Sequence, residues 1–251
     1  MFYLTLPSNS SSQFFPENTL THYFTKLPHS VDLTGGQWEV GLAEIQYPHT
    51  WYNIQGEDGW VDFEIDGVVL HAVLRAGYYP TPQILVKRME VICTSHLRKA
   101  RKCDAVEFLY DDITRKVTLG LKPDVAVTFG PLLKTMLGFS QDRYEEGVHE
   151  AENVVDIRQG FYSLYVYCNV VEPHMVGDVL APLLRIVPIR GKDGDLVTRS
   201  YDNISYHPVQ QKHFDTVELD IRDDTGRRVS FERGKVVITL HFRQRRSPHF
   251  L

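Results

Sequence analysis

The sequence has few cysteines and no long run of apolar residues. Its 251 residues include three cysteines, Cys93, Cys103 and Cys168, and contain no CxxC pair. An odd count without a paired spacing disfavours a disulfide framework and favours a reducing compartment. No stretch approaches the ~20 apolar residues of a membrane-spanning helix, and Pro7 breaks an N-terminal apolar run that has no basic leader. We therefore expect neither a membrane span nor a secretory signal.

The residue spacings of metal sites and of common catalytic centres are also missing. The eleven histidines include no HxH or HExxH pair, and only His71 and His241 stand out on predicted strands. No GxSxG or Walker loop occurs. Turn chemistry explains the paired carboxylates, because all of them lie in predicted turns or loops: Asp111–Asp112, Glu145–Glu146 and Asp223–Asp224. The sequence therefore predicts a protein that is not an enzyme and that binds no metal or cofactor.

The charge balance disfavours a protein whose main task is to coat nucleic acid. The net charge is −5, whereas such proteins usually carry a basic surplus. Basic residues do cluster in the run LRKARK, which includes Arg98, and again at Arg243–Arg246. The last turn of a helix is the simpler interpretation of LRKARK, with a nucleic-acid contact as the alternative. We expect no sequence-specific nucleic-acid binding.

Alternating apolar residues dominate both ends of the chain. Apolar runs separated by Pro, Asn, Ser and Gly are typical of strands joined by irregular loops. The predicted strands cover Phe2–Leu6, Leu20–Leu27, Trp38–Tyr47, Phe161–Val171, Leu183–Ile189, Leu196–Tyr206, Val217–Ile221 and Lys235–Phe242. Aromatic residues make up 12% of the chain, and their abundance also favours sheet.

One predicted hairpin is specific enough to be tested residue by residue. Its turn is Asp223–Gly226, a strong turn sequence. Period-2 alternation around this turn predicts one buried face and one wet face, with Asp220 on the wet face. The residues expected to face inward are Val217, Leu219 and Ile221, with Val229 and Phe231 on the paired strand.

The middle of the chain changes from strands alone to a mixture of helices and hairpins. The expected elements are hairpins over 60–74 and 106–121, a helix starting at Pro82, a short helix over 132–137, and a polar, acidic linker or surface loop over 142–152. Thr81 is a suitable N-cap for the first helix, and proline is favoured in the first helical position. Gly138 is placed to end the second helix.

These patterns together predict a mainly β protein, a single jelly-roll β-sandwich interrupted by an inserted α+β subdomain, with another two-sheet sandwich as the alternative to the jelly roll. Neither flank alone has enough strands to close a sandwich, so residues 1–55 and 158–247 must form it together. The insertion covers 56–157, and 248–251 is a C-terminal tail. A double jelly roll needs two sets of about eight strands, and the chain is too short for both.

Four segments near the two ends carry a family resemblance. They are FYLTLPSNSS (2–11), FFPENTLTHY (14–23), WEVGLAEIQYPHTWYN (38–53) and VELDIRDDTGRRVSFERGKVVITLHF (217–242). This wording resembles the minor capsid, or penton, protein of Polinton (Maverick) elements, which are virus-like DNA transposons. The resemblance implies a structural subunit that forms a homopentamer at the vertices of an icosahedral virion. It also implies contact with a double-jelly-roll major capsid protein and synthesis in a reducing host compartment, the cytoplasm or nucleus.

Four aromatic residues are candidates for an oligomer interface. Phe14 and Phe15 are adjacent in a Ser- and Pro-rich loop, where strand alternation cannot bury both, and Tyr47 and Trp51 lie near a strand end. Aromatic residues at such places often anchor a partner, although packing in the sandwich core is the alternative. Two other functions remain open at this stage. They are a carbohydrate-binding attachment module and, less favoured by the histidine spacing, a cupin-like enzyme.

Overall fold

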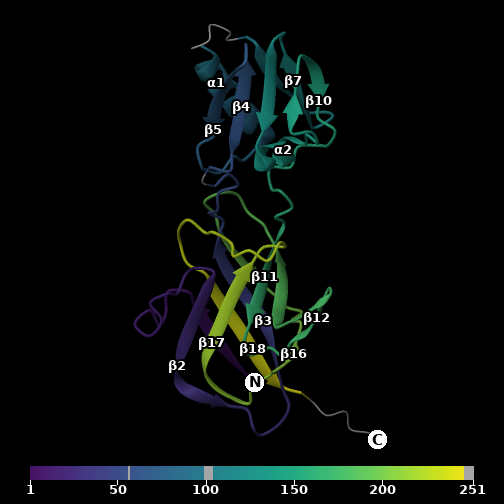
Figure 1. Cartoon of the computed structure of the whole chain (residues 1–251). Coiled ribbons are helices and arrows are strands. Elements are labelled where there is room, and N and C mark those ends of the chain that lie inside the picture. The colour runs from purple at the N-terminus through teal and green to yellow at the C-terminus, as the bar shows by residue number, and fades with distance from the viewer. Residues whose placement is uncertain (56, 99–103, 246–251) are drawn as a thin grey trace, which may run out of the picture. The chain divides into compact units, whose positions relative to one another are not determined.

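The chain folds into two compact units, each with its own apolar core. The structure is a computed structural model that describes residues 1–55, 57–98 and 104–245 (Figure 1). Unit 1 consists of Met1–Trp51 together with the chain from Phe161 onward, and unit 2 is Tyr52–Gly160. The predicted tail at 248–251, Cys103, Arg246 and the rest of the basic run after Arg98 lie outside the described residues.

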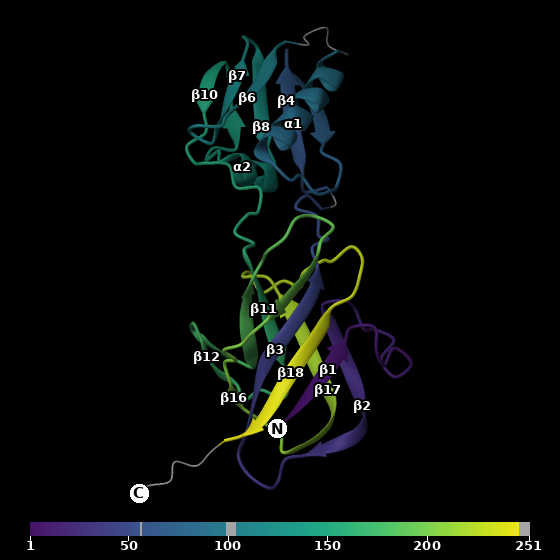
Figure 2. The same cartoon turned by 180° about the vertical axis from the view of Figure 1, so that it is seen from behind.

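Unit 1 is a β-sandwich of two antiparallel sheets (Figures 1 and 2). Its strands are β1 (Phe2–Pro7), β2 (His22–Asp32), β3 (Trp38–Pro48), β11 (Ser163–Cys168), β12 (His174–Val176), β13 (Val179–Ala181), β14 (Leu183–Pro188), β15 (Leu196–Ser200), β16 (His207–Pro208), β17 (His213–Arg222) and β18 (Val237–Gln244). One sheet has the order β1-β18-β3-β15, with β16 also paired to β3, and the other has the order β14-β11-β17-β2. Among the described strands, the short β12 and β13 pair only with each other.

The strand pairing is that of a jelly roll. Eight longer strands follow one another along the chain as β1, β2, β3, β11, β14, β15, β17 and β18. The first pairs with the eighth, the second with the seventh, the third with the sixth and the fourth with the fifth. Nested pairing of this kind, with alternate pairs in opposite sheets, makes a double-sheet jelly roll of eight strands. Unit 2 is inserted between β3 and β11. The predicted fold class, a jelly roll with an inserted α+β subdomain, is therefore confirmed.

The core of unit 1 lies between the two sheets. Leu219 and Ile221 on β17 are completely buried, as are Leu240 and Phe242 on β18 of the facing sheet. Each such side chain contributes roughly 1.5–3 kcal/mol through burial. The alternation predicted for Val217, Leu219 and Ile221 is therefore confirmed.

The sequence predicts a hairpin after β17, and this prediction is wrong beyond the turn. The Gly226 N–H does donate to the Asp223 carbonyl at 3.1 Å, but the ladder ends at a single bridge between Arg222 and Arg228. The next strand, β18, pairs with β3 and β1 in the other sheet. The chain must cross from one sheet to the other here, and buried Val229 lies on that crossing. Alternation alone does not distinguish such a crossing from a returning strand.

Asp220 also differs from its predicted place on a wet face. The residue is only 8% exposed. Arg222 donates to one carboxylate oxygen at 2.7 Å, and Arg228 donates to the other at 3.1 Å. The two guanidinium groups cover the carboxylate, which explains how a charged residue on the outer face becomes buried.

Unit 2 contains two sheets and two helices. Its elements are β4 (Trp60–Ile65), β5 (Val68–Val73), α1 (Pro82–Leu97), β6 (Val106–Asp111), β7 (Lys116–Leu121), β8 (Val125–Phe129), α2 (Pro131–Leu137), β9 (Arg143–Tyr144) and β10 (Gly147–Glu150). The sheets have the orders β5-β4-β8-β9 and β10-β7-β6. The Thr81 hydroxyl caps α1 by accepting from the Ile84 N–H at 3.3 Å, as predicted. Gly138 ends α2 with φ of 85°, and a Cβ there would meet the Asn153 carbonyl oxygen at 2.2 Å.

The predicted loop over 142–152 is wrong in part. It contains β9 and β10, and its residues Tyr144 and Ala151 are buried in the core of unit 2. Strand β8 was also missing from the expected elements. Strands β9 and β10 are short. Their backbone partners are β8 and β7, respectively, and a local sequence pattern does not reveal such pairing.

Candidate oligomer interface

The loop between β1 and β2, residues 8–21, covers the free edge of β2. The Asn18 side chain accepts from the Phe24 N–H at 2.9 Å and donates to the Phe24 carbonyl at 2.9 Å. The Ser11 hydroxyl accepts from the Lys26 N–H at 3.0 Å. These contacts satisfy backbone groups that an edge strand would otherwise leave open to another chain. The loop therefore has a fixed shape and holds its aromatic residues in defined places.

The loop presents one aromatic side chain to solvent and turns the next toward the protein. Phe14 is 59% exposed. Phe15 is half-buried, and its ring centroid lies 5.3 Å from that of Phe24. Whether these two residues contact another subunit remains a prediction. In this geometry Phe14 is the residue available for such a contact, and Phe15 supports the loop.

Tyr47 and Trp51 do not belong to an exposed patch, which corrects their placement in the candidate interface. Tyr47 is completely buried, and its hydroxyl accepts from the Arg190 N–H at 3.0 Å. Trp51 is 7% exposed, and its ring packs edge-on against Phe161 with 5.2 Å between centroids. Both residues fill the core of unit 1. A position near a strand end does not determine whether a side chain faces the core or the solvent.

The β12–β13 hairpin is an exposed apolar feature that sequence reasoning missed. Met175 and Leu180 lie directly opposite each other in its register and are 84% and 72% exposed. A two-stranded hairpin is marginally stable in water without a packed face. The Gly177–Asp178 pair at its tip, with φ of 62° at Gly177, is a turn signal that was available in the sequence.

The loop 8–21 and the β12–β13 hairpin lie on opposite sides of unit 1. The loop covers β2 and the hairpin leads into β14, and these are the two edge strands of one sheet. Figures 1 and 2 show both features projecting from opposite flanks of the sandwich. Unit 1 thus exposes apolar side chains on two different lateral surfaces.

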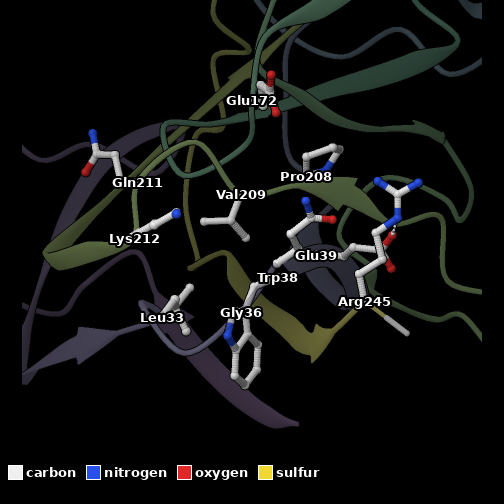
Figure 3. Close-up of a pocket in the computed structure, with 11 residues that line it drawn as sticks. Leu33, Gly36, Trp38, Glu39, Glu172, Pro208, Val209, Gln211, Lys212 and Arg245 are labelled. Atoms are coloured by element: carbon white, nitrogen blue, oxygen red, sulfur yellow. Dashed lines mark ion pairs between the residues drawn. The ribbon is translucent and has the colours of Figure 1, made fainter. Parts of the chain in front are cut away.

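A pocket of about 220 Å³ also lies in unit 1, near the start of β3 (Figure 3). Leu33, Trp38 and Val209 supply its apolar lining. The Glu39 carboxylate on its rim is held by Arg243 at 3.0 Å and lies 3.8 Å from Arg245. The charge of Glu39 is therefore already compensated by these two arginines, whereas Glu172 and Lys212 also line the pocket.

The titratable residues considered from the sequence lie apart from one another. His71 contacts Asp62 at 2.6 Å in unit 2, whereas His241 contacts the Tyr206 hydroxyl at 2.6 Å in unit 1. Burial raises the pKa of the Cys168 thiol to about 12, which makes this cysteine unreactive at neutral pH. Within residues 1–55, 57–98 and 104–245, no three potential ligands gather as a metal site. No helix in those residues is long and apolar enough to cross a membrane.

Comparisons with known proteins find similarity to solved structures, and two of these are described below. No family model and no curated protein matches the chain. The chain is similar to the mavirus penton protein, seen in a crystal structure of its selenomethionine-labelled form, with 10% identity, a TM-score of 0.49 and coverage of 96% of this chain and 98% of that one. It is also similar to a chain in the cryo-electron microscopy structure of the Sputnik virophage, with 8% identity, a TM-score of 0.46 and coverage of 96% and 97%.

Proposed function

We propose that this protein is a structural capsid vertex subunit, a penton of the Polinton type, that forms homopentamers. The proposal rests on the positions in the fold of the sequence segments that resemble the penton family. The segments 2–23, 38–53 and 217–242 are far apart in the sequence, yet they supply β1, β18 and β3 of one sheet and β17 of the other. The resemblance therefore follows a contiguous block of the jelly roll. Fold alone does not give function, so the proposal also depends on the sequence resemblance.

The surfaces of unit 1 suit a ring. A closed ring requires two different and complementary patches on each subunit. The side with loop 8–21 offers Phe14, and the opposite side offers Met175 and Leu180. Aromatic residues and methionine are enriched in the cores of protein interfaces. We propose that these two sides meet between neighbouring subunits.

The proposal includes a virion location and contact with a double-jelly-roll major capsid protein. It assigns no catalytic role to any residue. The alternative is a carbohydrate-binding jelly roll used for attachment, which would not require a ring.

Size-exclusion chromatography with light scattering tests the proposal. We expect a mass about five times the 28.9 kDa of one chain. Phe14→Ala should shift the protein toward monomer without lowering its melting temperature, whereas Phe15→Ala should lower it because Phe15 packs on Phe24. Ile113→Ala in unit 2, where Ile113 is 91% exposed, is the matched control and should leave the mass unchanged.

Two outcomes would count against the proposal. A Phe14→Ala variant that still runs as a pentamer removes loop 8–21 from the interface. A wild-type monomer that binds glycans on an array supports the attachment module instead.

A further inference from the structure

Three arginines without a carboxylate partner lie on the side of unit 1 that carries β14 and β15. They are Arg185 on β14, Arg199 on β15, and Arg190 in the loop that joins these strands. The Arg185 guanidinium carbon stands 3.6 Å from the centroid of the Tyr201 ring. None of the three arginines forms an ion pair within the described part of the chain. This group is called the arginine cluster below.

The arginine cluster and the neighbouring Tyr201 contain polar atoms that are shielded from solvent. Val197, Arg199 and Tyr201 are spaced two residues apart along β15 and just beyond its end, so their side chains lie on the same face, on which Val197 is buried. The Arg199 Nε and the Tyr201 hydroxyl are buried and have no hydrogen-bond partner among the described residues. Burying a donor without an acceptor is unfavourable, and a carboxylate matches the planar guanidinium fork. The cluster is thus suited to a carboxylate, and no described residue of the same subunit supplies one.

Electrostatic effects on Tyr47 place Arg190 near Arg199. Burial raises the pKa of Tyr47, whereas the positive charges of Arg199 and Arg190 act on it in the opposite direction. Both charges therefore lie within electrostatic range of one phenol. The Arg190 backbone N–H also donates to that phenol oxygen at 3.0 Å.

A complementary carboxylate lies on the opposite side of the sandwich. Glu17 in loop 8–21 is exposed, makes no ion pair with any described residue and is three residues from Phe14. Its acidic neighbours on that side are already occupied, since Asp215 pairs with Lys26 and Glu218 contacts His22. The two sides are opposite edges of the sandwich, so Glu17 does not reach the arginine cluster of its own subunit.

We infer that the arginine cluster of one subunit binds Glu17 of a second copy, as loop 8–21 docks against the β14 and β15 side of its neighbour. This inference rests on the proposed ring, because only a head-to-tail contact brings the two sides together. Phe14 accompanies Glu17 into the contact, where guanidinium groups also stack on aromatic faces. Charge complementarity of this kind sets register and partner choice.

A charge swap tests the inference in the full chain. Light scattering over a dilution series gives the concentration at half assembly. Glu17→Arg and Arg190→Glu should each raise that concentration by about tenfold or more, and the double variant should recover most of the loss. Arg190 is chosen because it is exposed, whereas Arg199 is half-buried and a substitution there could disturb folding. Lys87→Glu, an exposed site on α1 in unit 2, is the control for net charge and should change nothing.

The possible results separate this inference from the proposed function. Weaker assembly of the wild type at high salt, together with recovery in the swap, supports the contact. A pentamer that is unaffected by Glu17→Arg overturns the contact while leaving the ring intact. A wild-type chain that stays monomeric at every concentration overturns both.

Discussion

The most specific stability prediction concerns Asn18, whose side chain takes the place of a neighbouring strand on β2. It makes two hydrogen bonds of 2.9 Å with the backbone of Phe24, one as donor and one as acceptor. Asn18→Ala removes both. Each such bond contributes a net ~0.5–1.5 kcal/mol, so the loss should be about 1–3 kcal/mol. Water reaches an edge strand readily, and we therefore expect a value in the lower half of that range.

Urea unfolding followed by circular dichroism measures this loss. The slope of free energy against urea should stay the same while the midpoint falls, because the surface exposed on unfolding hardly changes. Asn9→Ala is the matched control. Asn9 lies in the same loop, is exposed and has no side-chain hydrogen bond among the described contacts, so its change should stay within about 0.5 kcal/mol. Equal effects of the two substitutions would refute the edge-covering role of the loop.

Three further predictions test the core, the histidines and the two units. Leu219→Ala should destabilise by roughly 2–5 kcal/mol, and Asp220→Ala by about 1–3 kcal/mol because two arginines bind its carboxylate; a silent Asp220→Ala in urea unfolding would contradict the burial. Burial holds the pKa values of His207 and His241 below the usual 6.5, so the unfolded chain takes up protons first. Stability should be full above about pH 7 and fall through pH 6, and His207→Gln should flatten this fall. Excising unit 2 through a short Gly/Ser linker should leave cooperative melting of a β-rich protein, and loss of all structure would show that the units fold as one.

Local patterns in the sequence predicted what local physics determines. Alternation found β17 and β18, and the cap residue Thr81 placed the start of α1. The pairing of β18 with β1 joins residues more than two hundred positions apart, and no neighbouring residue records that partner. Tyr47 and Trp51 were misplaced for the same reason, because their burial depends on the facing sheet. The β12–β13 hairpin was within reach, since its Gly-Asp turn lies between apolar pairs.

The central claim is that identical subunits close into a five-fold ring through two different sides of unit 1. Negative-stain electron microscopy of the purified protein, with class averages computed without imposed symmetry, tests it most directly. We predict rings of five subunits, and we expect Glu17→Arg to reduce their number while Lys87→Glu does not. Particles that remain single, or that pair about a two-fold axis, would contradict the account.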